Sequence, residues 1–523
     1  ILTGVKQIAE QAGVRPEEIS RFYHGTTVAT NIVLEHNGSL VGMITTEGFR
    51  DILHIARKKR PYNFSLYLDV PWQSRPLVKR RHRLTVAERI DARGQVLVPL
   101  DEPGVREAAR KLKKAGVEAV VIAFLNSFIN PSHEERAKEI VLEEFPEAYV
   151  CTSSEILSQY REYERFNTAA VNAYVGPKVS RYIHSLKNAL KDYGIRSELH
   201  LMQSSGGTAT ADAAIHKPVT LLLSGPAAGL IGGTKIANNA GYKNVITLDI
   251  GGTSADIGVA PFGEIRMKHL LDSKVGDYSI MVPIVDMDTI GAGGGSIAYV
   301  DDGGMFRVGP QSAGSDPGPA CYGRGGKEAT VTDCNLILGR IRKNSLLGGN
   351  FQLDPSLSEA VIQKLADKLG LGLEETALGA LRIMVNNMVR SIELNSVRRG
   401  YDPRDFVLVG FGGAGPMFAC DIALEMDIPT VLIPPHPGIT SAVGLLTTDL
   451  SYEYVRTIFS PIQDVDRKRL QTIFEELEAE ALAQLKKDGA TEDTIVLARY
   501  SDCRYVGQGY ELRIPAPSGV VDD

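Results

Sequence analysis

The spacing of apolar residues alternates between helical and strand-like periods along most of the chain. Residues 1–14 and 28–38 carry apolar positions at helical spacing, and residues 19–27 between them form a strand-like run. Residues 104–150 then predict a helix, a strand over 117–125, a second helix and a second strand. Strands that alternate with helices are typical of βαβ units with a parallel sheet. The pattern therefore predicts an α/β protein.

The apolar pattern also suggests where the domains divide. A helical pattern over 155–195 contains Gly176 and Pro177. Because proline lacks an N–H group and its ring clashes with the preceding turn, we expect the helix to break there, and we place a first domain boundary near residue 176. From Pro461 the chain shows an amphipathic helix and then strand-like residues. The predicted domains are an N-terminal domain over 1–176, a core domain over 177–455 and the start of a C-terminal domain over 456–523.

The length of 523 residues agrees with about three domains at roughly 150 residues each. The chain begins with Ile1 inside a helical pattern and stops at Asp523 soon after a strand-like run. We therefore expect that both the N-terminal and the C-terminal parts are incomplete.

Composition excludes two classes of partner. A net charge of -6 provides no basic field for nucleic acid or an anionic membrane, and the apolar run over 119–125 is far shorter than the roughly 20 residues of a membrane helix. One local exception is the basic and aromatic stretch over 57–83, where the interleaved prolines favour a solvated loop or interdomain contact over a nucleic-acid patch. Five single cysteines without a CxxC pair fit a reducing compartment. We expect a soluble cytoplasmic protein.

Glycine clusters carry the candidate chemistry. In residues 243–265 an apolar strand leads to Asp249, Gly251, Gly252 and Thr253, and a second strand begins near Asp256, so we predict a β-hairpin with a small turn. Glycines without a Cβ let backbone N–H groups wrap phosphate oxygens. Asp249, at the strand end, is suited to hold hydrated Mg²⁺ or to orient a water molecule. An ordinary glycine hairpin is the structural alternative.

A second glycine loop follows the strand at 405–410 and opens a helix over 411–426. A helix N-terminus presents free N–H groups and a positive dipole end, which suits a phosphate or the ribose edge of a nucleotide. The loop also matches GxGxxG, but the following TVLIPP segment ends in prolines rather than an acidic ribose-binding residue. This disfavours NAD or FAD.

Three further clusters leave two interpretations open. The glycines at 222–233 and 290–304 either line a nucleotide cleft or allow tight packing of helices and strands. In residues 24–31, Thr26 or Thr27 can cap the following helix, which leaves the other threonine and His24 for a ligand. A buried, hydrogen-bonded His24 is the structural alternative.

Together these segments resemble the hydantoinase A and 5-oxoprolinase family, whose members belong to the actin, sugar-kinase and Hsp70-like ATPase superfamily. The matching segments extend from residue 24 to 512 in the family's order and are HGTTVATNIVLEHNG, ITTEGFRDIL, REYERFNTAAVNAYV, MQSSGG, LLSGPAAG, LDIGGTSADIGV, GAGGGSIA, GPQSAGSDPGPACYGRGG, GFGGAGP, PPHPGITSAVGLL and RYVGQGYEL. The resemblance implies an actin/Hsp70-like ATPase fold with ribonuclease H-like duplicated domains and the nucleotide in the interdomain cleft. It also implies that LDIGGTSADIG is the second phosphate loop and VLVGFGGAGP the adenosine segment. The family's first phosphate loop, another DxGGTxxD, would lie upstream of residue 1.

The resemblance implies an activity, ATP-dependent hydrolysis of a cyclic amide such as hydantoin, N-methylhydantoin, 5-oxoproline or a related lactam. Phosphoryl transfer to the carbonyl oxygen removes amide resonance and creates a leaving group, and water then attacks the carbon. The implied cofactors are ATP and Mg²⁺. The assigned residues are Asp249, His24 and Thr26 for catalysis, Asp249 for the metal, Gly251, Gly252, Thr253 and Asp256 for the phosphates, and Gly410, Gly412, Gly413 and Gly415 for the nucleoside.

The family's polypeptide usually works with a hydantoinase B-like subunit that often carries a metal, so we expect an oligomer with such a partner. This chain shows no metal-ligand cluster of its own in the sequence, and His436, followed by Pro437 and Gly438, is expected to shape a loop. Two other functions stay open. One is an ATP-dependent ketone carboxylase subunit of the acetone or acetophenone type, and the other is a non-enzymatic nucleotide switch like Hsp70 or an actin-type filament.

Overall fold

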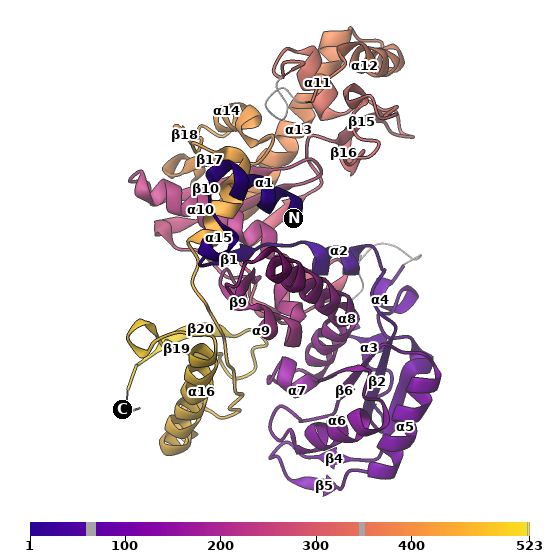
Figure 1. The fold of residues 1–523 in the computed structure, drawn as a ribbon, viewed down its shortest axis with the longest axis vertical. Helices are drawn as coiled ribbons and strands as arrows, with labels where there is room; N and C mark the ends of the chain where they lie inside the picture. The colour runs from indigo at the N-terminus through magenta and orange to yellow at the C-terminus, as the bar shows by residue number, and fades with distance from the viewer. Residues whose placement is uncertain (59–68, 345–350, 520, 522–523) are drawn as a thin grey trace.

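The computed structural model describes residues 1–58, 69–344, 351–519 and 521 as a mixed α/β protein (Figure 1). Its α-helices are α1 (Leu2–Ala12), α2 (Val28–Leu34), α3 (Ile52–Ile55), α4 (Pro71–Ser74), α5 (Glu102–Lys114), α6 (Ser132–Glu144), α7 (Ser153–Ile156), α8 (Glu162–Tyr193), α9 (Ala211–His216), α10 (Ser224–Asn239), α11 (Val331–Ile337), α12 (Pro355–Leu369), α13 (Leu373–Asn395), α14 (Gly415–Glu425), α15 (Thr440–Leu446) and α16 (Arg467–Lys487).

The β-strands form two larger sheets and several small ones. They are β1 (Phe22–His24), β2 (Val41–Thr46), β3 (Arg83–Val86), β4 (Arg89–Ile90), β5 (Val96–Val98), β6 (Ala119–Ala123), β7 (Tyr149–Thr152), β8 (Leu199–Met202), β9 (Thr208–Thr210), β10 (Val245–Ile250), β11 (Ala255–Ala260), β12 (Lys274–Val275), β13 (Tyr278–Ser279), β14 (Met287–Ile290), β15 (Ser296–Val300), β16 (Phe306–Ser312), β17 (Val407–Phe411), β18 (Thr430–Leu432), β19 (Arg499–Cys503) and β20 (Leu512–Ala516).

The N-terminal sheet has the order β3-β2-β6-β7, and all of its strands are parallel. Every residue of β2 and β6 is buried, as expected for strands with helices on both faces. Helices α5 and α6 pack on one face and α8 on the other. The prediction of parallel βαβ units over 104–150 is confirmed.

The core sheet has the order β14-β11-β10-β17-β18. β10 pairs antiparallel with β11 and parallel with β17, so the predicted hairpin and the predicted strand before the second glycine loop are both confirmed. Alternate residues of β10 face opposite sides: Val245 packs with residues of α10 and Ile246 with residues of α13 and α14. The core sheet is therefore covered by α10 on one face and by α13 and α14 on the other.

Helix α8 runs without interruption through the predicted break. Pro177 lies inside this 32-residue helix, so the prediction that the helix breaks at Gly176–Pro177 is wrong. A Cβ on Gly176 would lie 2.6 Å from the Tyr149 ring, which shows that the glycine lets a strand residue pack directly against the helix. Burial of the central turns stabilises a helix that local propensity alone would interrupt. The domain boundary near 176 stays a prediction, and it falls within α8.

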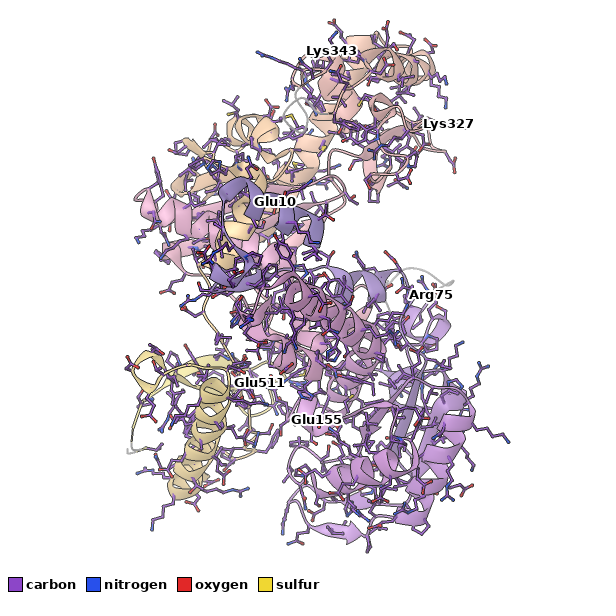
Figure 2. All side chains as sticks on the ribbon, viewed as in Figure 1. Glu10, Arg75, Glu155, Lys327, Lys343 and Glu511 are labelled. Atoms are coloured by element: carbon purple, nitrogen blue, oxygen red, sulfur yellow. The ribbon has the colours of Figure 1, made fainter. Side chains whose placement is uncertain are left out.

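The last segment contains the predicted amphipathic helix, α16, and an antiparallel hairpin of β19 and β20. Figure 2 shows Glu511 at the edge of this segment, where its carboxylate accepts hydrogen bonds from Arg161 and Arg504. In the described part of the basic stretch the structure has α4, a turn of 3₁₀ helix and the start of β3, while residues 59–68 of that stretch lie outside the described residues. Among the described helices, none has the length and apolarity needed to cross a bilayer.

Candidate functional site

The hairpin between β10 and β11 places two carboxylates side by side. Residues 251–254 form the short loop that joins the two strands. Asp249 and Asp256 are cross-strand partners in the antiparallel pair, so their side chains lie on the same face of the core sheet. The turn glycines therefore lie at the end of a strand pair that carries two acidic side chains.

The surroundings of these carboxylates disfavour their charged forms. Burial raises the pKa of Asp249, and a hydrogen bond of 3.1 Å from the Ser441 hydroxyl opposes this shift. Burial also raises the pKa of Asp256 to about 6, where a hydrogen bond from Thr289 lowers it and the charge of Asp249 raises it further. Each carboxylate thus has one side-chain donor, and the two repel one another.

Two further glycine-rich loops meet the glycine loop of this hairpin, so that three converge. The loop over 291–295 donates from the Gly294 N–H to the Gly251 carbonyl at 3.0 Å, and the loop over 411–415 donates from the Ala414 N–H to the Ile250 carbonyl at 2.9 Å. A Cβ on Gly293 would lie 2.6 Å from the Gly252 backbone, and close backbone packing explains this glycine. The cluster over 290–304 therefore supports the hairpin loop, and its residues lead into the antiparallel pair of β15 and β16.

Glycines in these loops have different neighbours. A Cβ on Gly252 or Gly413 would meet no atom within 4 Å, so both border open space. Gly412 has a φ of +82°, and a Cβ there would lie 2.3 Å from Asp249 Oδ1, so this position requires glycine. Gly410 and Gly415 face protein atoms instead: their Cβ atoms would lie 2.7 Å from the Ala419 Cβ and 3.1 Å from the Leu248 carbonyl oxygen.

Close packing of two helices explains Gly232 in the cluster over 222–233. A Cβ on Gly232 would lie 2.5 Å from the Thr440 carbonyl oxygen, and one on Gly444 would lie 2.0 Å from the Ala228 carbonyl oxygen. Helices α10 and α15 therefore approach one another at backbone distance. The Pro437 carbonyl just before α15 accepts a hydrogen bond of 2.9 Å from the Gly412 N–H, and the expected loop at 436–438 is confirmed as a short 3₁₀ turn.

The loop at 25–27, between β1 and α2, contacts helix α10, which Asp249 also contacts. A Cβ on Gly225 of α10 would lie 3.6 Å from the Thr27 methyl group, and a Cβ on Gly229 would lie 3.1 Å from Asp249 Oδ2. Positions 225 and 229 share one face of α10 and are about 6 Å apart along its axis. Thr27 and Asp249 therefore contact α10 at positions about one helical turn apart.

His24, the last residue of β1, and the two threonines of this loop already have protein partners. His24 Nε2 forms a hydrogen bond of 2.6 Å with the Tyr182 hydroxyl, and burial lowers the pKa of His24. Thr26 Oγ1 accepts from the Val28 N–H at 3.2 Å in the first turn of α2, whereas Thr27 is the N-cap residue without a side-chain cap. The structural alternative for His24, a hydrogen bond within the protein, is therefore present. A catalytic role for His24 and Thr26 stays a prediction.

Two residues of the site were not singled out from the sequence. Ser441 lies in the PPHPGITSAVGLL segment, which carried the family resemblance but no assigned role. Thr289 lies on β14, which pairs with β11 and so brings Thr289 opposite Asp256. Nothing in the sequence indicates this pairing. Both hydroxyls reach the carboxylates only through long-range packing.

The donor set fits a hard divalent cation. Asp249, Asp256, Thr289 and Ser441 present only oxygen atoms, which Mg²⁺ prefers, and a cation between the carboxylates would relieve their repulsion. Within the described residues there is no group of three or more histidine, cysteine or acidic side chains able to hold a metal. An ion here would depend on one or two carboxylates together with ligand and water oxygens, as Mg²⁺ commonly does.

Known proteins resemble the chain along nearly its whole length. Residues 165–454 match the hydantoinase/oxoprolinase family, and residues 1–145 match the hydantoinase/oxoprolinase N-terminal region. The chain is 38% identical to caprolactamase subunit alpha of Pseudomonas jessenii, covering 98% of this chain and 75% of that protein. It is 34% identical to the acetophenone carboxylase gamma subunit of Aromatoleum aromaticum, covering 99% and 73%. The crystal structure of the ATP-dependent caprolactamase from Pseudomonas jessenii superimposes with a TM-score of 0.85 at 36% identity, covering 100% of this chain and 76% of that chain.

The fold and the site define an α/β enzyme with glycine-rich loops gathered at the ends of its core strands. The chain belongs to the hydantoinase/oxoprolinase family. Two of its relatives are named as subunits, the alpha subunit of a caprolactamase and the gamma subunit of an acetophenone carboxylase.

Proposed function

We propose that this chain is the ATP-binding, A-type subunit of a cytoplasmic enzyme that hydrolyses a cyclic amide. The observation that carries the proposal is the convergence of three glycine loops on the Asp249–Asp256 pair, in a chain that aligns over its full length with an ATP-dependent caprolactamase. We further propose that the core sheet and its helices follow the actin/Hsp70-like ATPase plan, with the nucleotide in the interdomain cleft.

In this proposal the open side of the loops receives the nucleotide. Gly251, Gly252 and Thr253 contact the phosphates through backbone N–H groups, and Gly413 borders the nucleoside. Gly412 holds the second loop against Asp249, while Gly410 and Gly415 maintain its packing on the core sheet.

Asp249 and Asp256 supply the negative charge of the site. Asp249 binds Mg²⁺ or orients the reacting water, and Asp256 lies opposite it beside the phosphates. His24 and Thr26 are the proposed residues of the substrate end, which the hydrogen bond from the Ser224 hydroxyl at the start of α10 to the Thr26 carbonyl supports.

The chemistry follows from the low reactivity of an amide. The carbonyl oxygen takes the γ-phosphoryl group and ADP leaves, which removes amide resonance and makes phosphate the leaving group. Water then attacks the carbonyl carbon, the C–N bond breaks as the nitrogen takes a proton, and the ring opens to an acyl phosphate. A second water attacks the carbon of this acyl phosphate and releases phosphate. The chain's task is positioning and stabilisation of charge, which preorganised N–H groups supply at little reorganisation cost.

A hydantoinase B-like subunit is the proposed partner, since the related caprolactamase and carboxylase chains are named as subunits. The test is ADP release by this protein with its B-like subunit, across hydantoin, N-methylhydantoin, 5-oxoproline, caprolactam, and acetone or acetophenone with bicarbonate. We expect one cyclic amide to stimulate ADP release. Release that no cyclic amide stimulates would contradict the proposal.

The second candidate is an ATP-dependent ketone carboxylase subunit. The match to the acetophenone carboxylase gamma subunit, 34% identical over 99% of this chain, specifically favours it. In the same panel a carboxylase responds only to a ketone together with bicarbonate. This outcome would keep the nucleotide site and change the reaction.

A further inference from the structure

Helix α15 belongs to none of the glycine loops, yet it reaches the carboxylate pair through one side chain. Ser441, in the first turn of α15, donates from its hydroxyl to Asp249 Oδ2 at 3.1 Å. A Cβ on Gly229 of α10 would lie 3.1 Å from both of these oxygen atoms, so the two side chains meet where α10 has no side chain. Within the described part of the chain, this is the one side-chain hydrogen bond that Asp249 accepts.

The other oxygen of Asp249 lies against the second glycine loop, which is bound to the same segment as Ser441. A Cβ on Gly412 would lie 2.3 Å from Asp249 Oδ1. The Gly412 N–H donates to the Pro437 carbonyl at 2.9 Å, and Pro437 begins the 3₁₀ turn that leads directly into α15. Residues 437–441 therefore determine the surroundings of both oxygens, one through the Ser441 hydroxyl and the other through Gly412.

Close packing holds α15 against its neighbours. Gly444 of α15 meets the backbone of α10, where no side chain separates the two helices. Leu445 faces the loop at 25–27, where a Cβ on Gly25 would lie 3.9 Å from the Leu445 methyl group. Figure 1 shows α15 beside β1, with which it is in contact. Because closely packed elements transmit displacements to one another, the place of the Ser441 hydroxyl is fixed by this packing.

We propose that Ser441 is a positioning residue, which holds the Asp249 carboxylate in the orientation that phosphoryl transfer requires. This inference rests on the proposed function, because it names a further residue for the same site. Ser441 acts through Asp249, whose side chain would be free to rotate away from Gly229 once its single side-chain donor is lost. A misplacement of about 1 Å at a reacting group is enough to slow an enzyme severely.

Turnover by the complex with the B-like subunit tests the positioning role. Ser441→Ala removes the hydroxyl and Ser441→Thr keeps it, while the control Thr447→Ala removes a hydroxyl that donates to the Gly444 carbonyl at the far end of α15. We expect Ser441→Ala to lower kcat for ADP release about tenfold, because a hydrogen bond to a charged group is lost. The KM values for ATP and for the cyclic amide should change less than about twofold, since the glycine loops stay in place. Ser441→Thr should regain most of the lost turnover, and the control should match the wild type.

A double-mutant cycle in urea denaturation tests the contact without any substrate. Ser441→Ala should lower the urea midpoint of the wild-type chain and have no further effect in Asp249→Ala, where its acceptor is absent. If Ser441→Ala does not fold, Ser441→Cys takes its place in both tests, because a thiol is a similar group with a weak donor. Additive effects of the two substitutions would overturn the proposal.

The kinetic outcomes separate this inference from the proposed function. Stimulation of the wild type by a cyclic amide, with an unchanged kcat in Ser441→Ala, would refute the positioning role alone. A raised KM for ATP at unchanged kcat would refute it as well, since Ser441 would then serve nucleotide binding. A wild-type complex that no cyclic amide stimulates would refute the proposed function, and this inference with it.

Discussion

The N-terminal sheet and the core sheet both have acidic side chains near the ends of their strands. Only at the N-terminal sheet does the carboxylate accept a full set of hydrogen bonds. Glu134, at the N-terminal sheet, is fully buried. It accepts from the Phe124 N–H at 2.7 Å, from the Ser153 hydroxyl at 2.6 Å, and from the N–H and hydroxyl of Ser154 at 2.8 and 2.6 Å. Four donors occupy both oxygens of this carboxylate and leave it nothing further to bind.

The core sheet shows the opposite arrangement. Asp249 accepts one side-chain hydrogen bond, from Ser441, and Asp256 accepts one, from Thr289. Burial with few donors raises the pKa of both carboxylates, and a cation or polar ligand would complete their coordination. The number of donors around a buried acid therefore separates a structural carboxylate from one that is available for chemistry.

The largest expected effect is on Asp249. In Asp249→Asn we expect substrate-coupled ADP release to fall 100- to 1,000-fold, about 3–4 kcal/mol in activation free energy, because the charge of the site is lost. The unfolding free energy should change by less than about 1 kcal/mol, since the residue contributes little to packing. Turnover and urea denaturation measured on the same preparation check both parts. Turnover at the wild-type rate would remove Asp249 from the mechanism.

Glu134 should respond in the reverse way. Glu134→Gln replaces one acceptor oxygen with an amide NH₂ that faces N–H and O–H donors, so we expect a loss of about 2–3 kcal/mol in unfolding free energy. The exposed Glu135 on the same helix provides the control, and Glu135→Gln should be neutral. Urea denaturation measures both. Equal stability of the two variants would show that the number of hydrogen-bond donors does not separate the Glu134 carboxylate from those at the core sheet.

The glycine loops offer a matched pair of substitutions. Gly412→Ala is expected to cost about 2 kcal/mol of stability, because φ is positive and the new Cβ meets Asp249 Oδ1. Gly252→Val should leave stability nearly unchanged, since its Cβ meets open space, and should weaken nucleotide binding at least tenfold, about 1.4 kcal/mol. Thermal melts and nucleotide titration test the pair. Unchanged nucleotide affinity in Gly252→Val would refute the phosphate-loop assignment.

The smallest expected effect is a pH dependence from Asp256. Its pKa of about 6 in the folded chain lies above the ordinary value of 3.8, so the folded state binds this proton more tightly. The resulting stability is present below about pH 4 and is lost as pH rises through 6. Asp256→Asn should therefore match the wild type near pH 4 and exceed it by about 1–2 kcal/mol at pH 7.5. A constant difference across this range, measured by denaturant titration, would place the pKa elsewhere.

Helices, strands and turns could be predicted from the sequence better than the long-range contacts between them. The hairpin at 245–260 and the loop before α14 were predicted because alternation, glycine turns and helix starts are local signals. The continuity of α8 through Pro177 was missed because burial across the whole molecule outweighs a local helix breaker. Thr289 and Ser441 carry no local signal, since only strand pairing and helix packing bring their hydroxyls to the carboxylates.

The most direct test of the central claim, that the glycine loops and carboxylates direct phosphoryl transfer to a carbonyl oxygen, is an oxygen-tracing measurement. The cyclic amide that stimulates ADP release is prepared with ¹⁸O in its carbonyl group, and the released phosphate is analysed by mass spectrometry. Because the second water attacks the carbon of the acyl phosphate, phosphate leaves with the original carbonyl oxygen, and we expect one ¹⁸O atom in each phosphate. Phosphate without ¹⁸O, together with full retention of the label in the ring-opened product, would contradict the account.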